Sequence, residues 1–327
     1  MKHSATKALF LLAGALLTPL TLRAGVSEGG EPARKSHEHR FINPLLEHVK
    51  FKELRPFKAK IQEKIEQAVK DGRVDSAAVY FRSLSEGMWF GINEREPFSP
   101  ASIMKVPIMM AYYKMAEKDP AILGKNLLYM TDPQDAAEGV THRTAVPGKL
   151  YTAEQLIGIM ISESDNSAAA ILADNIPADD LINTFGFFGM AITGKDARDS
   201  FDSLKTSASL LRVLYNSSYL NEEFSEKALE HLSNCTFTDG IRAGVPAEYA
   251  VAHKFGARSL EGDKKQLHDV AIVYYTGNPY LLSVMTKGIG KDYSNLARLI
   301  RDISSITFRE VSSQHDSGSE AKTAVIE

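Results

Sequence analysis

The sequence predicts an α+β protein in two parts, an antiparallel sheet built from both chain ends with flanking helices, and an all-helical region inserted between them. Three observations predict this class. Short runs rich in Val, Tyr and Phe lie near both ends of the folding portion, and residues at helical spacing precede the first run and follow the last. The long interval between the runs has apolar residues at helical spacing. Strands at the ends and helices in the middle favour a sheet completed by both termini.

The composition limits the class of protein and of partner. With 327 residues and 44% hydrophobic content, the chain can bury a large core. The net charge of −3, with signs interspersed, gives no basic stripe, so we expect no nucleic-acid partner. Cys235 is the only cysteine, which excludes an intrachain disulfide. We interpret it as a buried, inert thiol.

The first residues have the form of a secretory signal peptide. Lys2 and Lys7 precede an apolar run that begins at residue 8, and small residues follow it at Ala24. The apolar run is interrupted by Thr and Pro and falls short of the roughly 20 residues that a bilayer span needs. We therefore expect residues 1–24 to be a signal peptide, the protein to be exported to the periplasm or the medium, and no stable membrane insertion. An uncleaved N-terminal anchor is the alternative.

Polar, glycine-containing stretches delimit the folded domain. Residues 25–42 predict a flexible linker, and residues 311–327 predict a disordered tail. Between them, residues 43–310 form one expected catalytic domain, with the helical insertion at about 101–245.

The elements of that domain can be expected in order along the chain. An amphipathic pattern at residues 61–69 stops at Gly72, as a helix with a glycine C-cap would. Residues 76–84 and 88–92 are β-rich runs around a short turn, which predicts a hairpin. Helices are expected next at 106–116, 153–161 behind the capping box Thr152…Gln155, 167–174 and 207–215. Strands at 251–254, 268–275 and 280–285 and a helix at 293–306 complete the set.

Ser102 and Lys105 form an S-x-x-K motif directly before an apolar helical run. At this spacing the ammonium and the hydroxyl share one helix face, and the helix N-terminus presents free N–H groups to a developing oxyanion. A lysine can deprotonate serine only if its own pKa is depressed. Bringing it from about 10.4 to near 7 asks roughly 4 to 5 kcal/mol of its surroundings. The motif alone is weak, because residues 4–7 also match it.

Two further short motifs follow in order. Ser164-Asp165-Asn166 falls between two expected helices, where a plain N-cap and turn is the alternative interpretation. Lys254-Phe255-Gly256 ends an expected strand, where Gly256 would let a substrate approach the backbone. Residues 70–72 match the same K-x-G form at a helix end, so this motif is also weak alone.

The ordered set of three motifs resembles the penicillin-recognising serine hydrolases, and the helical insertion between sheet-forming ends resembles class A β-lactamases in particular. The resemblance extends over residues 43–309. It is strongest at residues 98–107, 161–166 and 251–286. It implies the serine β-lactamase-like fold.

The resemblance also implies roles for individual residues. Ser102 would be the nucleophile and Lys105 its base. Ser164 would pass a proton to the leaving nitrogen, Asn166 would bind the substrate's amide, and Lys254 would hold Ser164 and the substrate carboxylate. Gly256 would leave room for the substrate beside the strand. The oxyanion would meet the N–H groups of Ser102 and Ala257. The implied reaction is β-lactam ring opening through an acyl-enzyme.

The chain departs from the family pattern at two places. Class A enzymes carry a glutamate on a loop after the S-D-N helix, and residues 167–206 contain none. The nearest acidic residues are Asp196, Asp199 and Asp202, which solvated loop positions also explain. Phe255 stands where the family has Thr or Ser, which would cost roughly 1.5 to 3 kcal/mol of carboxylate binding unless Arg258 or Arg242 compensates.

Two alternatives remain open from sequence. The substrate is a small molecule, either a β-lactam or a cell-wall peptide, so a D-alanyl peptidase or another amide or ester hydrolase of the envelope is possible chemistry for the same nucleophile. The other alternative is a non-catalytic envelope binding protein. We expect no cofactor and no metal, because His37 and His39 form the one tight histidine pair and lie beside the linker. The sequence gives no signal for an oligomeric state.

Overall fold

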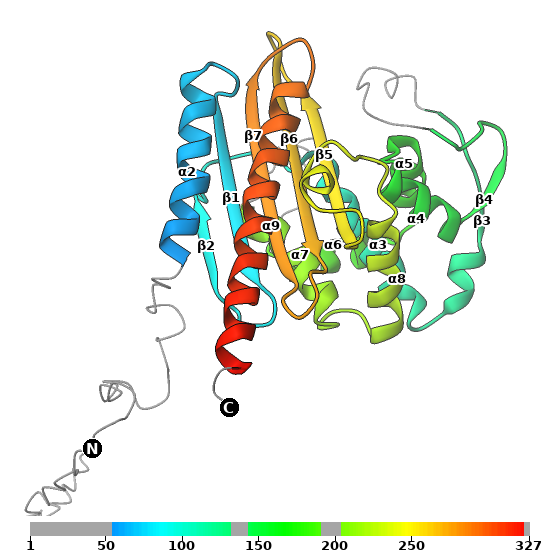
Figure 1. Cartoon of the computed structure of the whole chain (residues 1–327). Helices are drawn as coiled ribbons and strands as arrows, with labels where there is room; N and C mark the ends of the chain where they lie inside the picture. Colours follow the sequence, from blue (N-terminus) through cyan, green and yellow to red (C-terminus); the bar gives the residue numbers. More distant parts are fainter. Residues whose placement is uncertain (1–53, 132–142, 191–203, 324–327) are drawn as a thin grey trace, which may run out of the picture. The chain divides into compact units, whose positions relative to one another are not determined.

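The structure is a computed structural model that describes residues 54–131, 143–190 and 204–323. Five antiparallel strands form the central sheet in the order β2-β1-β7-β6-β5. Figure 1 shows α2 and α9 against one face of this sheet. The first two strands and the last three come from opposite ends of the chain, so the predicted fold class is confirmed. The strands are β1 (Ser76–Ser83), β2 (Trp89–Ile92), β5 (Val251–Ser259), β6 (Lys264–Val273) and β7 (Tyr280–Ile289).

Alternation along the strands divides the core into two clusters. In β1, Ala77 and Val79 face a cluster that includes Ile61 of α2 and Ile300 of α9, whereas Tyr80 faces the helical part. Because both faces of the sheet are covered, β1 is apolar almost throughout rather than alternating with polar residues. The outer helices are α2 (Leu54–Lys70) and α9 (Ser294–Thr323).

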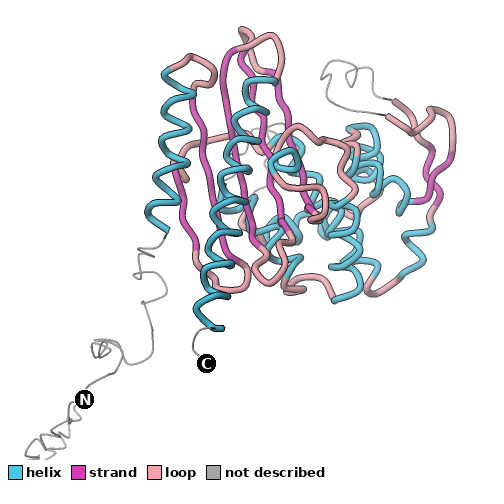
Figure 2. Tube along the Cα trace, in the orientation of Figure 1, coloured by secondary structure: helices cyan, strands magenta, loops and turns pink. Residues whose placement is uncertain are grey.

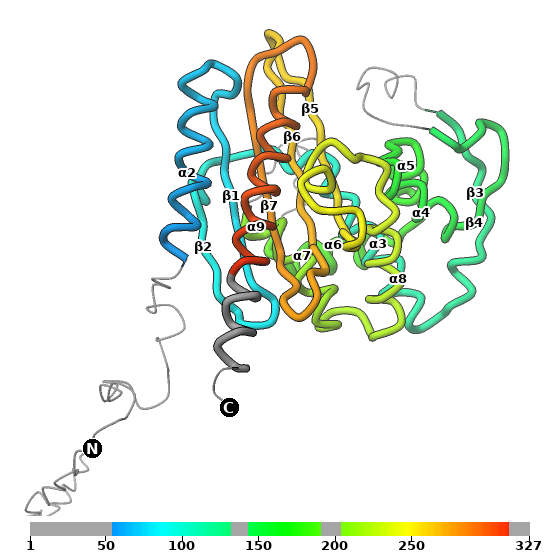
Figure 3. The backbone as a smooth tube through the Cα atoms, in the orientation of Figure 1, coloured from blue at the N-terminus to red at the C-terminus, as the bar shows by residue number. Residues whose placement is uncertain are grey.

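The helical part is inserted between β2 and β5, as Figure 3 lets the reader follow from cyan through green to yellow. It packs on the sheet mainly through α7. Its helices are α3 (Lys105–Ala116), α4 (Ala153–Ser162), α5 (Asn166–Asp174), α6 (Ala178–Phe187), α7 (Leu204–Tyr215) and α8 (Glu222–Ser233), with 3₁₀ turns η1 (Ala101–Met104), η2 (Pro120–Gly124) and η5 (Ile241–Gly244).

The expectation of an all-helical insertion is wrong in one respect. Strands β3 (Asn126–Leu128) and β4 (Leu150–Thr152) pair antiparallel and form a small second sheet, visible apart from the main sheet in Figure 2. Three residues are too few to show an alternating pattern, and the partners are far apart in sequence. The capping box Thr152…Gln155 at the start of α4 is confirmed.

Helix α9 continues to Thr323, beyond residue 311, where the disordered tail was expected to begin. Val311 is 2% exposed and belongs to the same buried cluster as Ile61 and Ile300, so the apolar face of the helix extends beyond the expected end. The expected signal peptide and linker, and residues 43–53 of the expected domain, lie outside the described residues. Among the described helices, none combines the length and the apolar character that crossing a bilayer requires.

Candidate functional site

Ser102 lies in the 3₁₀ turn η1, and Lys105 begins the helix α3 that comes next. Residues three apart in a 3₁₀ turn lie one above the other, so the S-x-x-K spacing places the ammonium over the hydroxyl. Lys105 Nζ lies 3.0 Å from Ser102 Oγ. The structure therefore brings the expected nucleophile and base into hydrogen-bonding contact.

Lys105 is also held from the α4–α5 connection. Its Nζ donates to the Ser164 main-chain oxygen at 2.6 Å, to Ser164 Oγ at 3.3 Å and to Asn166 Oδ1 at 2.5 Å. The side chain is only 5% exposed, and a buried ammonium is tolerated where polar partners surround it. Ser102, Lys105, Ser164 and Asn166 thus form one cluster.

The Ser164-Asp165-Asn166 turn serves two purposes. Asp165 is the N-cap of α5, where its carboxylate accepts the Ala168 N–H at 2.6 Å and the Tyr129 hydroxyl at 2.9 Å. The plain N-cap interpretation is therefore right for the middle residue. The residues on either side of it face Lys105 instead.

Two backbone positions at this cluster are in the left-handed region. Ala101 has φ +48° and Ser164 has φ +59°. Such values are uncommon for residues other than glycine, and they cost of order 1–3 kcal/mol where the surroundings enforce them. Ala101 directly precedes Ser102, and Ser164 itself carries one of the hydroxyls that contact Lys105.

Strand β5 brings the third motif against η1, the turn that carries Ser102. A Cβ on Gly256 would lie 3.1 Å from Ala101 Cβ, from Pro100 O and from Ser102 N, so only glycine fits without displacement. Within the described residues the Ser102 N–H has no acceptor. Ala257, the next residue of the strand, is 8% exposed. The strand therefore runs directly beside the main-chain nitrogen of Ser102, one of the two groups expected to meet an oxyanion.

Lys254 does not make the expected contact with Ser164 within the described residues. It is fully buried, and its Nζ donates to the Phe255 main-chain oxygen at 2.9 Å. Burial lowers the pKa of Lys254 to about 8. The Phe255 side chain is 2% exposed and stacks on Phe237 with ring centroids 4.6 Å apart. As a phenylalanine it offers no hydroxyl at this position.

The two arginines considered as compensating donors differ. Arg258 Nη1 donates to Ser99 Oγ at 2.7 Å, and Ser99 lies three residues before Ser102. Arg242 donates to the main-chain oxygens of Tyr249 at 2.8 Å and Pro246 at 2.9 Å. Arg258 is therefore the arginine that lies near η1, and Arg242 binds main-chain oxygens of a neighbouring loop.

A buried polar cluster behind the site was missed by sequence reasoning. His253 Nδ1 lies 2.9 Å from Asp269 Oδ1, and the other Asp269 oxygen accepts the Ile241 N–H at 2.8 Å. In the β5–β6 register, His253 and Asp269 sit on diagonal positions of one face, and strand alternation was the signal that could have paired them. The loop carboxylates Asp196, Asp199 and Asp202 lie outside the described residues.

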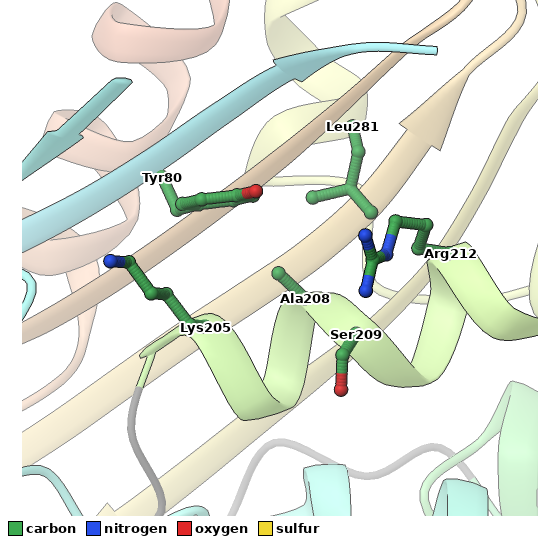
Figure 4. A pocket seen from close by; sticks show the side chains of 6 residues that line it. All are labelled: Tyr80, Lys205, Ala208, Ser209, Arg212 and Leu281. Atoms are coloured by element: carbon green, nitrogen blue, oxygen red, sulfur yellow. The ribbon is translucent and has the colours of Figure 1, made fainter. Parts of the chain in front are cut away.

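A separate pocket lies between α7 and the sheet (Figure 4). It has a volume of about 150 Å³, and neither the cluster around Lys105 nor the Lys254-Phe255-Gly256 motif lines it. Its walls are Tyr80, Lys205, Ala208, Ser209, Arg212 and Leu281. In the described ranges, no three His, Cys, Asp or Glu side chains are grouped so that they could hold a metal ion.

Comparisons with known proteins bear on the family and the fold of the chain. Residues 58–311 match the model of the β-lactamase enzyme family. The chain is 23% identical to a β-lactamase of Streptomyces albus G over 243 residues, covering 68% of this chain and 76% of that protein. It is 24% identical to β-lactamase VEB-1 of Pseudomonas aeruginosa over 272 residues, covering 75% and 88%.

Among solved structures, PBP-A superposes with a TM-score of 0.67 at 21% identity, over 80% of this chain and 97% of that one. A leucine-to-glutamate variant of PBP-A, solved as an acyl-enzyme complex with penicillin G, superposes with a TM-score of 0.65 at 22% identity, over 78% and 97%. At these identities the superpositions show the fold.

Proposed function

Because the chain belongs to the β-lactamase enzyme family, we propose that it is a serine hydrolase that opens the β-lactam ring through an acyl-enzyme on Ser102 and releases the product slowly. One observation carries the proposal. The Lys105 ammonium lies 3.0 Å from the Ser102 hydroxyl inside a buried set of polar partners. A weak nucleophile needs an adjacent base in this position.

Acylation can be derived from the contacts of Lys105. In its neutral form Lys105 takes the proton of Ser102 as Ser102 Oγ attacks the ring carbonyl. The oxyanion meets the N–H groups of Ser102 and Ala257. Such donors are worth about 3 kcal/mol each in comparable enzymes. The close approach of Gly256 to Ser102 N keeps both donors on the same side of the reacting carbon.

The second proton transfer uses the same ammonium. Lys105 Nζ is 3.3 Å from Ser164 Oγ, so the proton taken from Ser102 can pass through Ser164 to the leaving ring nitrogen. Asn166 gives its side-chain oxygen to Lys105, which leaves its amide N–H groups to bind the substrate's side-chain carbonyl. Lys254 contributes its charge to recognition of the substrate carboxylate.

Slow release rests on the composition of the segment after the Ser164-Asp165-Asn166 turn. Residues 167–206 contain no glutamate that could activate a deacylating water. The family's usual proton acceptor for this step is therefore missing from the interval, and acylation has a clearer chemical basis here than turnover.

A second candidate substrate is a cell-wall peptide ending in D-alanine. Two features favour this peptide substrate. The glutamate is missing from residues 167–206, and the Phe255 side chain, which stacks on Phe237, supplies no hydroxyl for a β-lactam carboxylate. The same Ser102–Lys105 pair would form the acyl-enzyme with the peptide carbonyl.

The test is labelling with a fluorescent penicillin. Wild type and the control Ser233→Ala, an exposed serine at the end of α8, should label equally, and Ser102→Ala should not. Equal labelling of Ser102→Ala would remove Ser102 as the nucleophile. Chasing the label with unlabelled penicillin then gives the acyl-enzyme lifetime. Parallel assays of cephalosporin hydrolysis and of D-alanine release from a D-alanyl-D-alanine peptide decide between the two substrates.

We also propose that the protein is exported and cleaved after Ala24. Expression in a bacterial host should yield a periplasmic or secreted form whose N-terminal sequence starts at Gly25. A membrane-bound form that retains residues 1–24 would contradict this.

A further inference from the structure

The pocket between α7 and the sheet combines an apolar wall with a positive charge. Tyr80 and Leu281 come from neighbouring strands of the sheet, Ala208 faces them from α7, and Arg212 brings a guanidinium from the next turn of that helix. In Figure 4 the Tyr80 hydroxyl and the Arg212 guanidinium point toward one another from opposite sides of the pocket. None of the six wall residues is acidic, so the walls carry positive charge only.

Arg212 is the cation of these walls that a ligand can use. The other one, Lys205, is already paired, because its Nζ lies 3.0 Å from Glu94 Oε1 and 4.6 Å from the centroid of the Trp89 ring. Arg212 is partly buried, and its side chain makes no hydrogen bond or ion pair in the part of the chain that the structure describes. An arginine offers five N–H donors in a planar fork that matches a carboxylate. The charge of the pocket therefore favours an anion.

Hydroxyls without partners on the sheet side of the pocket are an independent observation. Tyr80 is 9% exposed, and within the described ranges its hydroxyl has no hydrogen-bond partner. Ser283 stands opposite Tyr80 in the β1–β7 register, and its Oγ is buried without a partner as well. Buried polar groups are normally hydrogen-bonded. The Tyr80 hydroxyl points into the pocket, so it can donate to a ligand there.

The size of the pocket limits the ligand to a small molecule. Its volume is about 150 Å³, and an apolar cavity of about this size in another protein holds benzene. The Tyr80 ring and the Leu281 side chain give one aromatic ring an apolar surface to pack on. A second fused ring would exceed the space.

We propose that this pocket binds a small aromatic carboxylate, whose ring packs on Tyr80 and Leu281 and whose carboxylate accepts hydrogen bonds from Arg212 and the Tyr80 hydroxyl. The pocket is separate from the residues around Ser102. It lies on β1 and β7, whereas the strand that packs against η1 is β5, and β6 lies between β7 and β5 in the sheet. The proposal does not depend on the proposed hydrolase activity.

Trp89 is the only tryptophan of the chain and reports on this pocket. Its ring stacks on the Tyr80 ring with centroids 5.7 Å apart, so a ligand on Tyr80 changes its surroundings. Benzoate, added at constant ionic strength, should change the Trp89 fluorescence saturably with a millimolar Kd, and titration calorimetry should give the same Kd. Benzamide lacks the charge and acetate lacks the ring. Each should bind about tenfold more weakly or worse, as the loss of a charge-assisted hydrogen bond or of the ring contacts implies.

Variants assign the binding to the pocket. Arg212→Gln should weaken benzoate binding by about tenfold to hundredfold and remove the preference for benzoate over benzamide. Tyr80→Phe keeps the ring and should weaken binding by about threefold to tenfold. The matched control is Arg298→Gln, an exposed arginine of α9, which covers the other face of the sheet, and it should bind benzoate as wild type does. Urea unfolding verifies that each variant is folded.

Three results would overturn the proposal. They are the absence of saturable binding by both methods up to tens of millimolar benzoate, equal affinity of wild type for benzoate and benzamide, and unchanged benzoate affinity in a folded Arg212→Gln protein. The comparison of ligands uses wild type alone, so it remains decisive if a variant does not fold. Penicillin labelling plays no part in these measurements, so a failure of the proposed function would leave their outcome unaffected.

Discussion

Replacing Gly256 by alanine tests whether strand β5 sets the position of η1, the turn that carries Ser102. The added Cβ would lie 3.1 Å from Ala101 Cβ, Pro100 O and Ser102 N, and two of these atoms belong to the backbone. Neither can rotate away, so the strand or the turn must move by a few tenths of an ångström. Overpacking of this kind costs about 1–3 kcal/mol of unfolding free energy. Complete loss of one oxyanion donor costs about 10²–10³-fold in rate, so partial displacement of the Ser102 N–H should slow acylation by about 10–100-fold.

The measurements are urea unfolding and the rate of labelling by a fluorescent penicillin, with Gly186→Ala as the matched control. A Cβ on Gly186 meets nothing within 4 Å, and this residue lies inside helix α6. The control should label at the wild-type rate and gain about 0.5–1 kcal/mol from the better helix propensity of alanine. If Gly256→Ala loses stability but labels at the wild-type rate, the Ser102 N–H is not an oxyanion donor. If it changes neither property, the packing of β5 against η1 is itself refuted.

Three predictions concern pH. Burial lowers the pKa of His268 from 6.5 to about 4. Between these two pH values the unfolded chain binds a proton at His268 and the folded chain does not. The free energy of unfolding should therefore fall by about 3 kcal/mol between pH 6.5 and 4. His268→Gln should remove that loss in urea unfolding, and an unchanged slope would contradict this origin. Burial opposes ionisation of Glu154, but hydrogen bonds from His231 and Lys227 lower its pKa. Glu154→Gln should therefore lower the free energy of unfolding by about 1–3 kcal/mol at pH 7. The difference in stability between wild type and variant should disappear as the pH falls below about 4 and Glu154 becomes protonated. A constant difference at both pH values would exclude the ionised form as the cause. The rate of penicillin labelling should decline as the pH rises through about 8, where Lys254 loses its proton. Lys254→Arg should flatten this pH profile because arginine stays charged. A decline that persists in the variant would assign the titration to another group.

The fold was predictable where a local pattern carried it. The capping box at Thr152 and the glycine stop at Gly72 mark helix ends by chemistry that acts within a few residues. Strand β5 was expected to end at Lys254 and instead runs to Ser259. Glycine in a strand normally weakens it, and here Gly256 is required by a neighbour about 150 residues away in sequence. Such non-local packing has no signature in the local sequence.

Helix α8 illustrates a pattern that was present but obscured. Phe224, Ala228 and Leu232 recur at four-residue spacing and are buried, and Asn221 caps the helix through the Phe224 N–H. Charged residues between them dilute the apolar signal. The long α9 was underestimated for a related reason, because its polar residues conceal the apolar position at Val311.

The two lysines of the site show why motif and role are not equally predictable. Lys105 is three residues from Ser102, so backbone geometry alone brings the two groups together, and the spacing was sufficient to predict their contact. Lys254 is fully buried, and burial lowers its pKa while the charges of Cys235 and Asp269 oppose this effect, so its charge state depends on groups that no motif contains. A sequence match at Lys254 therefore fixes the residue type and leaves its protonation to the tertiary structure. The pH dependence of labelling measures this protonation.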